Sequence, residues 1–461
     1  MKKIKLGFMI LFLLIVFRGF SQNTYQPNWK SIDSRPVPAW FEDAKFGIFI
    51  HWGLFSVPSW GPTKGDVYEK YAEWYWYRIN PNGKISASFV DFHNKMYGTK
   101  FLYQDFVTDF KAELFNPDQW AEIFKNAGAN YIVLTSKHHE GFALWPSAES
   151  ANWNSVDVGP HRDLCGELTK SVKTIGLHMG FYYSLYEWFN PLFKSNISKY
   201  VDDHMIPQLK DLVTRYEPDI LWTDGEWDYP SETWKSTTFL SWLYNESNVK
   251  NSVVVNDRWG NDTRSKHGGF YTTEYDLVGD QNTKGNKFDH SWEECRGIGS
   301  SFGYNRNENL EDYETSESLI HMLVEKVARG GNLLLNVGPT ADGRIPVIMQ
   351  QRLFDIGKWL KINGDAIYKT RKWNDAPVIT PETTVYYTKK GNDLFVILTK
   401  WQNRPIVIDK INKAQNVTML GLSSKVRFSK SGNKLTIFIP SVSPSENPSD
   451  YAWVFKIKQV F

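Results

Sequence analysis

PDQWAEIFKNAGANYIVLTSKHH, residues 117–139, joins the two patterns that recur along most of this chain. Residues 117–129 begin with a proline, carry apolar residues at helical spacing and end beside a glycine, which are the signals of an amphipathic helix. Residues 131–139 open as an apolar run and close on polar and ionisable side chains. A helix followed by a buried strand is the repeating unit of a parallel α/β sheet.

The same alternation extends from about residue 28 to residue 370. Six further apolar runs predict strands, at 46–53, 177–184, 220–225, 253–259, 269–275 and 332–339. Amphipathic stretches that predict helices lie between them, at 162–176, 200–218 and 317–331. Seven strands over this length favour a (β/α)8-like TIM barrel over a doubly wound sheet, and we expect the missing eighth strand at 301–305. In such barrels the chemistry takes place at the carboxyl ends of the strands.

Residues 371–461 show strands without helices. Residues 384–400 predict a hairpin with Gly-Asn-Asp in its turn, and residues 434–440 and 452–458 predict further strands. We therefore expect a catalytic barrel over 28–370 followed by a small C-terminal β-sandwich domain over 371–461.

The first 21 residues carry the pattern of a secretory signal peptide. A basic start, MKKIK, precedes the twelve-residue apolar run 6–17, and Gly19 and Ser21 suit cleavage before Gln22. The apolar run is too short for a comfortable membrane span, although an uncleaved N-terminal anchor is the alternative. We expect an exported protein without a membrane span after cleavage. It would be periplasmic or secreted in a bacterium, and lysosomal or extracellular in a eukaryote.

Composition excludes several classes of function. With 41% hydrophobic and 23% charged residues, the 461-residue chain is typical of a globular protein rather than a disordered or multi-span one. Residues 22–461 hold 49 Lys and Arg against 51 Asp and Glu without a basic run, so nucleic acid is not an expected partner. Cys165 and Cys295 are too few and too far apart for a disulfide framework or a structural zinc cluster.

The absence of cofactor motifs narrows the chemistry. The chain has no Gly-rich dinucleotide loop, P-loop, HExxH motif or serine nucleophile elbow, so we expect no cofactor. Carboxylates, histidines and an aromatic content of 16% remain, and these are the groups that glycosidases use.

Asp224 is the strongest candidate for a nucleophile because it ends the apolar run 220–225 and precedes Gly225, which lets the chain turn. A capping role for Asp224 is the structural alternative, and Glu226 and Asp228 lie nearby. Glycoside hydrolysis needs a second carboxyl group. The spacing does not choose among the candidates, which are Glu274, Glu293 and Glu294. Glu293 and Glu294 lie in HSWEEC, residues 290–295, within an expected long loop over 260–300, and loops of that length are often functional. An apolar neighbour such as Trp292 can raise a carboxyl pKa for acid duty.

Histidines and aromatic residues at other strand ends are candidates for sugar binding. His138 and His139 are adjacent, and adjacent strand residues point to opposite faces, so we expect sugar contacts rather than a metal ion. His51 ends an apolar run in the same way. Trp222 shares a strand face with Asp224, and Arg258 either binds the ligand or pairs with Asp257. Ordinary core packing is the alternative for each of these side chains.

Several stretches together resemble the α-L-fucosidases of glycoside hydrolase family 29, including the animal lysosomal type. They occur in order from about residue 40 to 370, and include DILWTDGEWD (219–228), GGFYTTEY (268–275), HSWEECRGIGSSFGYNR (290–306) and GGNLLLNVGPTADG (330–343). The resemblance implies a retaining exo-enzyme that removes terminal α-L-fucose from fucosylated oligosaccharides or glycoconjugates, without a metal or cofactor.

The resemblance also implies roles for particular residues. Asp224 would be the nucleophile and form a fucosyl–Asp224 intermediate, and Glu293 would be the acid/base, with Glu274 as runner-up. The fucose contacts would be His51, Glu73, Trp74, His138, His139, Tyr182, Trp222 and Arg258. The alternatives are an exo-glycosidase for another sugar, a lectin-like protein that has lost catalysis, and a metallohydrolase that uses His51, His138 and Asp224. The fucosyl linkage and the oligomeric state, a homo-oligomer included, stay open.

Overall fold

A computed structural model describes residues 24–275, 290–373, 377–380 and 383–460. The predicted signal peptide, residues 1–21, lies outside the described residues. Among the residues described, no helix has the length and apolar character needed to cross a membrane.

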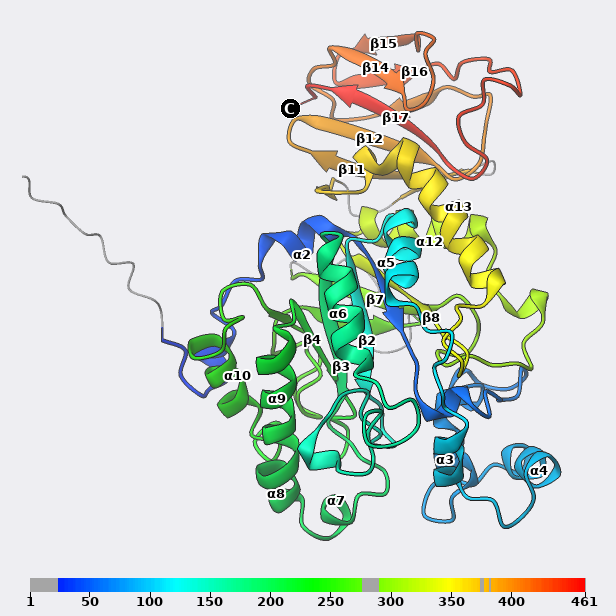
Figure 1. The fold of residues 1–461 in the computed structure, drawn as a ribbon. Coiled ribbons are helices and arrows are strands. Elements are labelled where there is room, and N and C mark those ends of the chain that lie inside the picture. Colours follow the sequence, from blue (N-terminus) through cyan, green and yellow to red (C-terminus); the bar gives the residue numbers. More distant parts are fainter. Residues whose placement is uncertain (1–23, 276–289, 374–376, 381–382, 461) are drawn as a thin grey trace, which may run out of the picture.

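Eight strands form one parallel sheet with the order β5-β4-β3-β2-β1-β8-β7-β6. The strands are β1 (Phe46–Ile50), β2 (Tyr131–Lys137), β3 (His178–Ser184), β4 (Ile220–Asp224), β5 (Val254–Val255), β6 (Tyr271–Glu274), β7 (Trp292–Gly297) and β8 (Asn332–Val337). Helices lie around the curled sheet (Figure 1). The predicted barrel architecture is therefore confirmed, and each of the seven residue ranges predicted as strands contains one of the observed strands.

The eighth strand is not at 301–305, where the sequence pattern placed it. Residues 301–305 are irregular, and the strand is β7, Trp292–Gly297, within a segment that was expected to be a long loop. Its sequence WEECRG is polar at three of six positions, so hydrophobic periodicity did not reveal it. The carboxylates of Glu293 and Glu294 are buried because they have hydrogen-bond partners inside the protein.

The sheet curls until its two edges approach each other. No strand ladder joins β5 to β6 in the described part of the chain, but the Phe270 N–H donates to the Val255 carbonyl over 3.0 Å. Side chains that point inward form a core of their own, and it includes Tyr131 of β2, Trp222 of β4 and Cys295 of β7.

Helices between the strands cover the outside of the sheet. α5 begins after Asn116, whose side chain accepts from the Gln119 N–H, and it has Pro117 in its first turn, as the sequence predicts. The connecting helices are α3 (Tyr75–Ile79), α4 (Ala87–Met96), α5 (Pro117–Asn126), α6 (Leu164–Thr174), α7 (Pro191–Ser195), α8 (Ile197–Tyr200), α9 (Ile206–Tyr216), α10 (Ser236–Asn245), α12 (Ser316–Ala328) and α13 (Val347–Asn363).

The C-terminal region is antiparallel and holds two sheets. One has the order β10-β11-β12-β17-β14 with β9 also paired to β11, and the other has the order β13-β16-β15. Its strands are β9 (Arg371–Lys372), β10 (Val378–Ile379), β11 (Thr384–Lys390), β12 (Asp393–Leu398), β13 (Ile406–Ile408), β14 (Asn416–Met419), β15 (Phe428–Ser431), β16 (Lys434–Ile437) and β17 (Trp453–Lys458). Figure 1 shows this region at the top, whereas the segments that follow the carboxyl ends of β1 and β3 lie at the bottom.

Candidate active site

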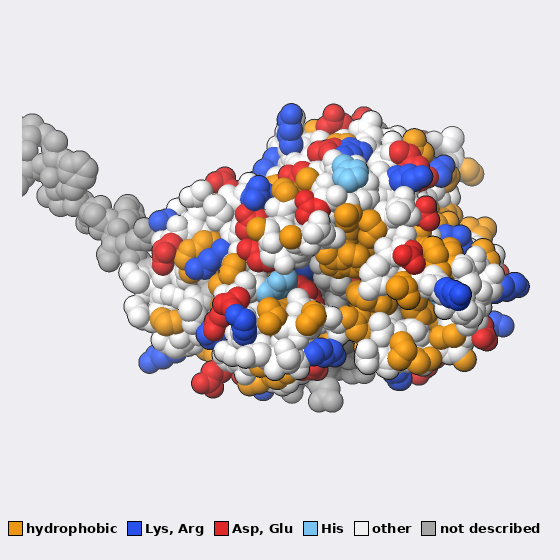
Figure 2. All heavy atoms as spheres, turned by 60° about the horizontal axis from the view of Figure 1, so that its bottom comes forward, with side chains coloured by type: hydrophobic (Ala, Val, Ile, Leu, Met, Phe, Trp, Pro, Cys, Tyr) orange, Lys and Arg blue, Asp and Glu red, His pale blue; other side chains and the backbone are white. Residues whose placement is uncertain are grey.

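A cavity of about 400 Å³ opens at the carboxyl ends of the barrel strands. Figure 2 views the molecule from the end that lies at the bottom of Figure 1, and it shows hydrophobic side chains gathered on this face. The residues that line the cavity are Phe49, His51, Tyr68, Tyr71, Glu73, Trp74, His138, His139, Tyr182, Trp222, Asp224, Trp227, Arg258, Arg264, Glu274, Cys295 and Phe302. A cavity of this size, with aromatic walls and a few convergent polar groups, suits a small polar ligand such as a sugar.

Asp224 is the last residue of β4, and its carboxylate has two close partners. Arg258 Nη1 donates to Oδ1 over 2.8 Å, and the Tyr182 hydroxyl donates to Oδ2 over 3.0 Å. Burial alone would raise the pKa of Asp224, but the Arg258 guanidinium, with a smaller contribution from Arg264, holds it well below its usual value. The chain turns away at Gly225, where φ is 74°, as the sequence suggested. The result is an ionised carboxylate that remains accessible from the cavity.

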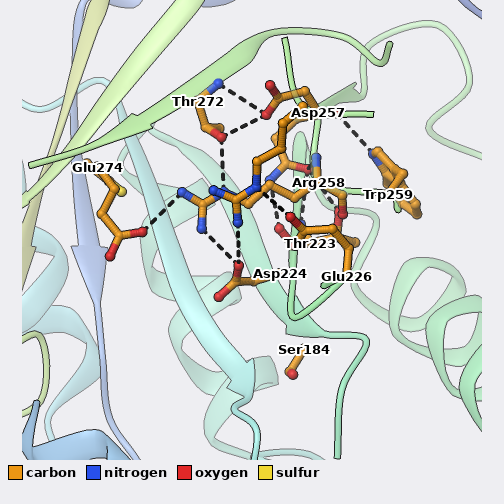
Figure 3. A network of polar contacts seen from close by, with 12 residues as sticks. Ser184, Thr223, Asp224, Glu226, Asp257, Arg258, Trp259, Thr272 and Glu274 are labelled. Atoms are coloured by element: carbon orange, nitrogen blue, oxygen red, sulfur yellow. Dashed lines mark hydrogen bonds and ion pairs between the residues drawn. The ribbon is translucent and has the colours of Figure 1, made fainter. Parts of the chain in front are cut away.

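Arg258 organises the polar network of the cavity (Figure 3). Its Nη2 lies 3.2 Å from Glu274 Oε2, and its Nε donates to Thr272 Oγ1 over 3.0 Å. Asp257 faces the other way and accepts from the Thr272 N–H and hydroxyl. Arg258 thus binds two carboxylates of the cavity, and Asp257 is not its partner.

The two glutamates considered for acid/base duty occupy different layers of the barrel. The register of β6 and β7 pairs Glu274 with Cys295 and Thr272 with Glu293. Glu274 and Cys295 line the cavity, whereas Glu293 is 1% exposed and is not among the lining residues. Glu293 instead accepts from the Tyr131 hydroxyl over 2.5 Å and from Trp222 Nε1 over 3.0 Å.

His51 and His139 are held as neutral hydrogen-bond acceptors. Asn336 Nδ2 donates to the Phe302 carbonyl, so its Oδ1 accepts from His51 Nδ1 over 2.7 Å. The Ser184 hydroxyl donates to the Tyr186 carbonyl, so its Oγ accepts from His139 Nδ1 over 2.6 Å. Burial lowers the pKa of His51 to about 3 and that of His139 well below its usual value. Each ring therefore keeps an unprotonated Nε2.

Both His138 and His139 line the cavity, contrary to the expectation that neighbouring residues point to opposite faces. The reason is that β2 ends at Lys137, so the two histidines lie beyond the strand and its alternation no longer applies. In the part of the chain that the structure describes, no group of three His, Cys, Asp or Glu residues is arranged to hold a metal ion.

Glu73 lines the cavity and has one buried carboxylate oxygen without a partner among the described residues. Its Oε2 accepts from the Gly303 N–H over 2.8 Å and from the Ser301 hydroxyl over 3.0 Å. Its Oε1 has no hydrogen-bond partner among the described residues, and burial raises the pKa of the group. A buried carboxylate oxygen without a partner needs a donor, and a sugar hydroxyl supplies one.

Sequence reasoning missed several residues of the cavity wall, which include Tyr68, Tyr71, Trp227 and Arg264. Arg264 lies between two carboxylates, with Nε 2.5 Å from buried Glu226 Oε1 and Nη2 3.6 Å from Asp224 Oδ1. It stands in a loop without periodicity, so only the loop's length marked it as a candidate region. Cys295 was missed as a lining residue because β7 was not recognised as a strand.

Comparison with known proteins gives a consistent result. The model of the family described as alpha-L-fucosidase matches residues 13–365, and that of the alpha-L-fucosidase C-terminal domain matches residues 379–458. Tissue alpha-L-fucosidase from Bos taurus is 45% identical over 95% of this chain and 92% of its own length. The one from Homo sapiens is 44% identical over 98% of this chain and 97% of its own length.

Solved structures agree with the sequence relatives. Thermotoga maritima alpha-fucosidase in complex with a mechanism-based inhibitor is 38% identical, with a TM-score of 0.81 over 94% of this chain and all of that one. The structure of that enzyme in complex with fucose has 36% identity and a TM-score of 0.79 over the same shares of the two chains.

Proposed function

The chain belongs to the α-L-fucosidase family and is a glycoside hydrolase of α-L-fucosides; from this premise we propose that Asp224 is its nucleophile and Glu274 its acid/base. The reaction is a double displacement. Asp224 attacks the anomeric carbon of a terminal α-L-fucosyl group while an acid protonates the departing oxygen, and water then hydrolyses the fucosyl–enzyme ester.

The observation that carries the proposal is that Arg258 forms ion pairs with both Asp224 and Glu274 inside the cavity. Because its pKa lies below the usual value, Asp224 is ionised across the working range of pH, as a nucleophile must be. A retaining enzyme needs its two carboxyl groups about 5–5.5 Å apart. One guanidinium that binds both side chains keeps them on the same small region of the wall.

Glu274 is preferred to Glu293 as the acid/base because of access. A general acid must come within hydrogen-bond reach of the leaving oxygen. The Glu274 carboxyl lines the cavity, with the Tyr71 hydroxyl 2.9 Å from Oε1. Glu293, the assignment that the family resemblance favoured, has both oxygens occupied by Tyr131 and Trp222 one layer deeper.

The walls of the cavity also suit fucose. L-Fucose presents hydroxyl donors on its ring, and the cavity offers acceptors in His51 Nε2, His139 Nε2 and Glu73 Oε1. Phe49 and Phe302 supply an apolar wall for its C5 methyl group. We assign Trp74, His138, Tyr182, Trp222 and Arg258 as the other sugar contacts.

Release of 4-nitrophenol from its α-L-fucoside tests the nucleophile. We expect Asp224→Gly to abolish turnover and added azide to restore part of it as β-fucosyl azide, because azide then attacks the face that Asp224 used. Turnover that survives in Asp224→Gly assigns the nucleophile to another carboxylate. Binding of fucose by a wild-type protein that turns over neither aryl nor oligosaccharide fucosides would establish the lectin-like alternative.

We further propose that residues 1–21 direct export, that the catalytic domain spans 28–370 and the β-sandwich domain 371–461, and that the substrates are fucosylated oligosaccharides or glycoconjugates. N-terminal sequencing of the mature secreted protein, with Gln22 as the expected first residue, tests the export signal.

A further inference from the structure

The buried carboxylate of Glu293 lies directly behind the cavity wall. Along β7 the side chains of Glu293 and Cys295 point inward, and alternate residues of a strand are about 6.6 Å apart along its axis. Cys295 lines the cavity, so Glu293 occupies the next layer down. A buried carboxylate needs partners, and Glu293 takes one donor from β2 and one from β4.

The packing beside Glu293 is shaped for this arrangement. Tyr131 lies opposite Gly47 in the register of β1 and β2. A Cβ on Gly47 would lie 2.3 Å from Tyr131 Cε2, so only glycine leaves room for the phenol ring. The ring crosses the barrel interior over this gap, and its hydroxyl reaches Glu293 Oε2 on β7.

Trp222 connects Glu293 to the reacting groups. Its indole N–H donates inward to Glu293 Oε1, while its ring is part of the cavity wall. The Arg258 guanidinium lies over that ring, with Cζ 4.5 Å from the centroid. The Tyr182 ring stacks on it at 5.7 Å with an interplanar angle of 22°. Trp222 therefore contacts both of the side chains that hydrogen-bond to Asp224.

We propose that Glu293 is a positioning residue, which fixes the Trp222 ring through Nε1 and thereby sets where Arg258 and Tyr182 hold Asp224. This inference rests on the proposed roles of Asp224 and Glu274. It gives Glu293 an effect on catalysis without contact with the substrate. The Glu293 carboxylate fixes the orientation of the Trp222 indole. The indole in turn packs against the Arg258 guanidinium and the Tyr182 ring.

The pattern of defects in variants distinguishes a positioning residue from an acid/base. A variant that lacks the acid loses most activity on substrates with poor leaving groups, little on activated aryl fucosides, and gains turnover with azide. A positioning defect weakens every substrate alike, because the nucleophile is misplaced for all of them. Gln keeps one acceptor for Trp222 Nε1, whereas Leu keeps none.

The test compares Glu293→Gln and Glu293→Leu with wild type on a series of aryl α-L-fucosides and on a fucosyl disaccharide. We expect kcat/KM to fall by about 10- to 100-fold in Glu293→Leu, with the same factor for every leaving group and no gain from azide. Glu293→Gln should retain several-fold more activity than Glu293→Leu. If Glu293→Leu does not fold, the uniform defect of Glu293→Gln alone carries the test.

A matched control lies next to Glu293 on the same strand. Glu294 is equally buried, and it accepts from Thr273 and Arg296 rather than from Trp222. Glu294→Gln should keep kcat/KM within about twofold of wild type, as for a substitution away from the site. An equal loss in Glu294→Gln and Glu293→Gln would show that burial of charge on β7, rather than the bond to Trp222, is responsible, and would overturn the proposal.

Two further outcomes also overturn it. A loss confined to poor leaving groups, with azide rescue as α-fucosyl azide, would make Glu293 the acid/base. Wild-type activity in both Glu293 variants would remove any catalytic role. Failure of the nucleophile assignment is recognised separately, because it appears as activity that survives in Asp224→Gly.

Discussion

Arg258 Nη1 donates to Asp224 Oδ1 over 2.8 Å, and the two side chains are only 2% and 11% exposed. Burial penalises the charged form of Asp224, and Arg258 is the first group that offsets this penalty. Asp224, the proposed nucleophile, thus owes its ionised state chiefly to Arg258, and that dependence has measurable consequences.

Replacement of Arg258 by Met should raise the pKa of Asp224, because burial then acts on the carboxylate with less compensation. The acid limb of kcat/KM against pH should move to higher pH, and activity at neutral pH should fall by about 100- to 1000-fold. Arg264→Met is the matched control, since its Nη2 lies at the longer distance of 3.6 Å, and it should cost less. An acid limb that stays in place in Arg258→Met would show that Arg258 does not control the ionisation of Asp224.

Glu274→Gln should lose more activity on substrates whose leaving group depends more strongly on protonation by a general acid. On a fucosyl disaccharide we expect kcat/KM to fall by about 100- to 10000-fold, with a smaller loss on 4-nitrophenyl fucoside. Azide should then restore turnover as α-fucosyl azide, because it replaces water in the second displacement. Equal losses on the two substrates would reject Glu274 as the acid/base.

Glu293 should make the stability of the protein depend on pH. Burial raises its pKa to about 7 from the ordinary 4.5, although Tyr131 and Trp222 act in the opposite direction. Between these two pH values Glu293 is protonated in the folded state and ionised in the unfolded chain. Protonation of Glu293 therefore contributes its full stabilisation of the folded state below pH 4.5, and this stabilisation is lost as the pH rises to about 7. The free energy of unfolding of wild type, relative to Glu293→Gln, should therefore fall by about 3 kcal/mol over that range.

Denaturant unfolding at several pH values measures this difference. Tyr131→Phe removes a hydrogen bond that lowers the pKa of Glu293, so the loss of stability should extend to higher pH and become larger in total. A difference between wild type and Glu293→Gln that is independent of pH would mean that folding leaves the pKa of Glu293 unchanged, and one that rises with pH would mean that folding lowers this pKa.

Gly47→Ala should destabilise the protein by about 1–3 kcal/mol, because the added methyl group would clash with the Tyr131 ring. Combination with Tyr131→Ala removes the obstacle, so the double variant should be more stable than the sum of the two single effects predicts. Thermal and denaturant unfolding of the four proteins measure the coupling. Strict additivity would show that the ring and Gly47 do not constrain each other.

The sequence predicted the barrel and indicated Asp224, Trp222 and the cavity histidines, because these residues follow strand periodicity or stand where a strand ends. Glu73, Trp74 and Tyr182 were expected as sugar contacts only from the family resemblance. Asp224 and Trp222 could be found together since β4 alternates regularly and closes on the aspartate. The alternation rule wrongly placed His138 and His139 on opposite faces, because β2 ends at Lys137, two residues before the predicted strand 131–139 does.

Two other features had no local signal. β7 is polar in sequence and buried in the structure, since its carboxylates find donors on strands far away in the chain. These hydrogen bonds between residues distant in the chain cannot be predicted from a short stretch of sequence. They hold Glu293 behind the cavity, whereas the family resemblance placed it among the reacting groups. Arg264 likewise acquires its position from Glu226 and Asp224, which precede it by 38 and about 40 residues.

The approach of β5 to β6 gives Arg258 and Glu274, two side chains of the proposed active site, a structural role as well. With no ladder between these strands in the described residues, the barrel is closed at this point by Arg258 on Thr272 and Glu274, by Asp257 on Thr272, and by a backbone bond from Phe270 (Figure 3). Side chains proposed for hydrolysis thus also form the contacts that join the two edges of the sheet. A substitution of Arg258 that removes activity should therefore also weaken the contacts between β5 and β6. Amide hydrogen exchange at Thr272 would measure this weakening separately from the loss of turnover.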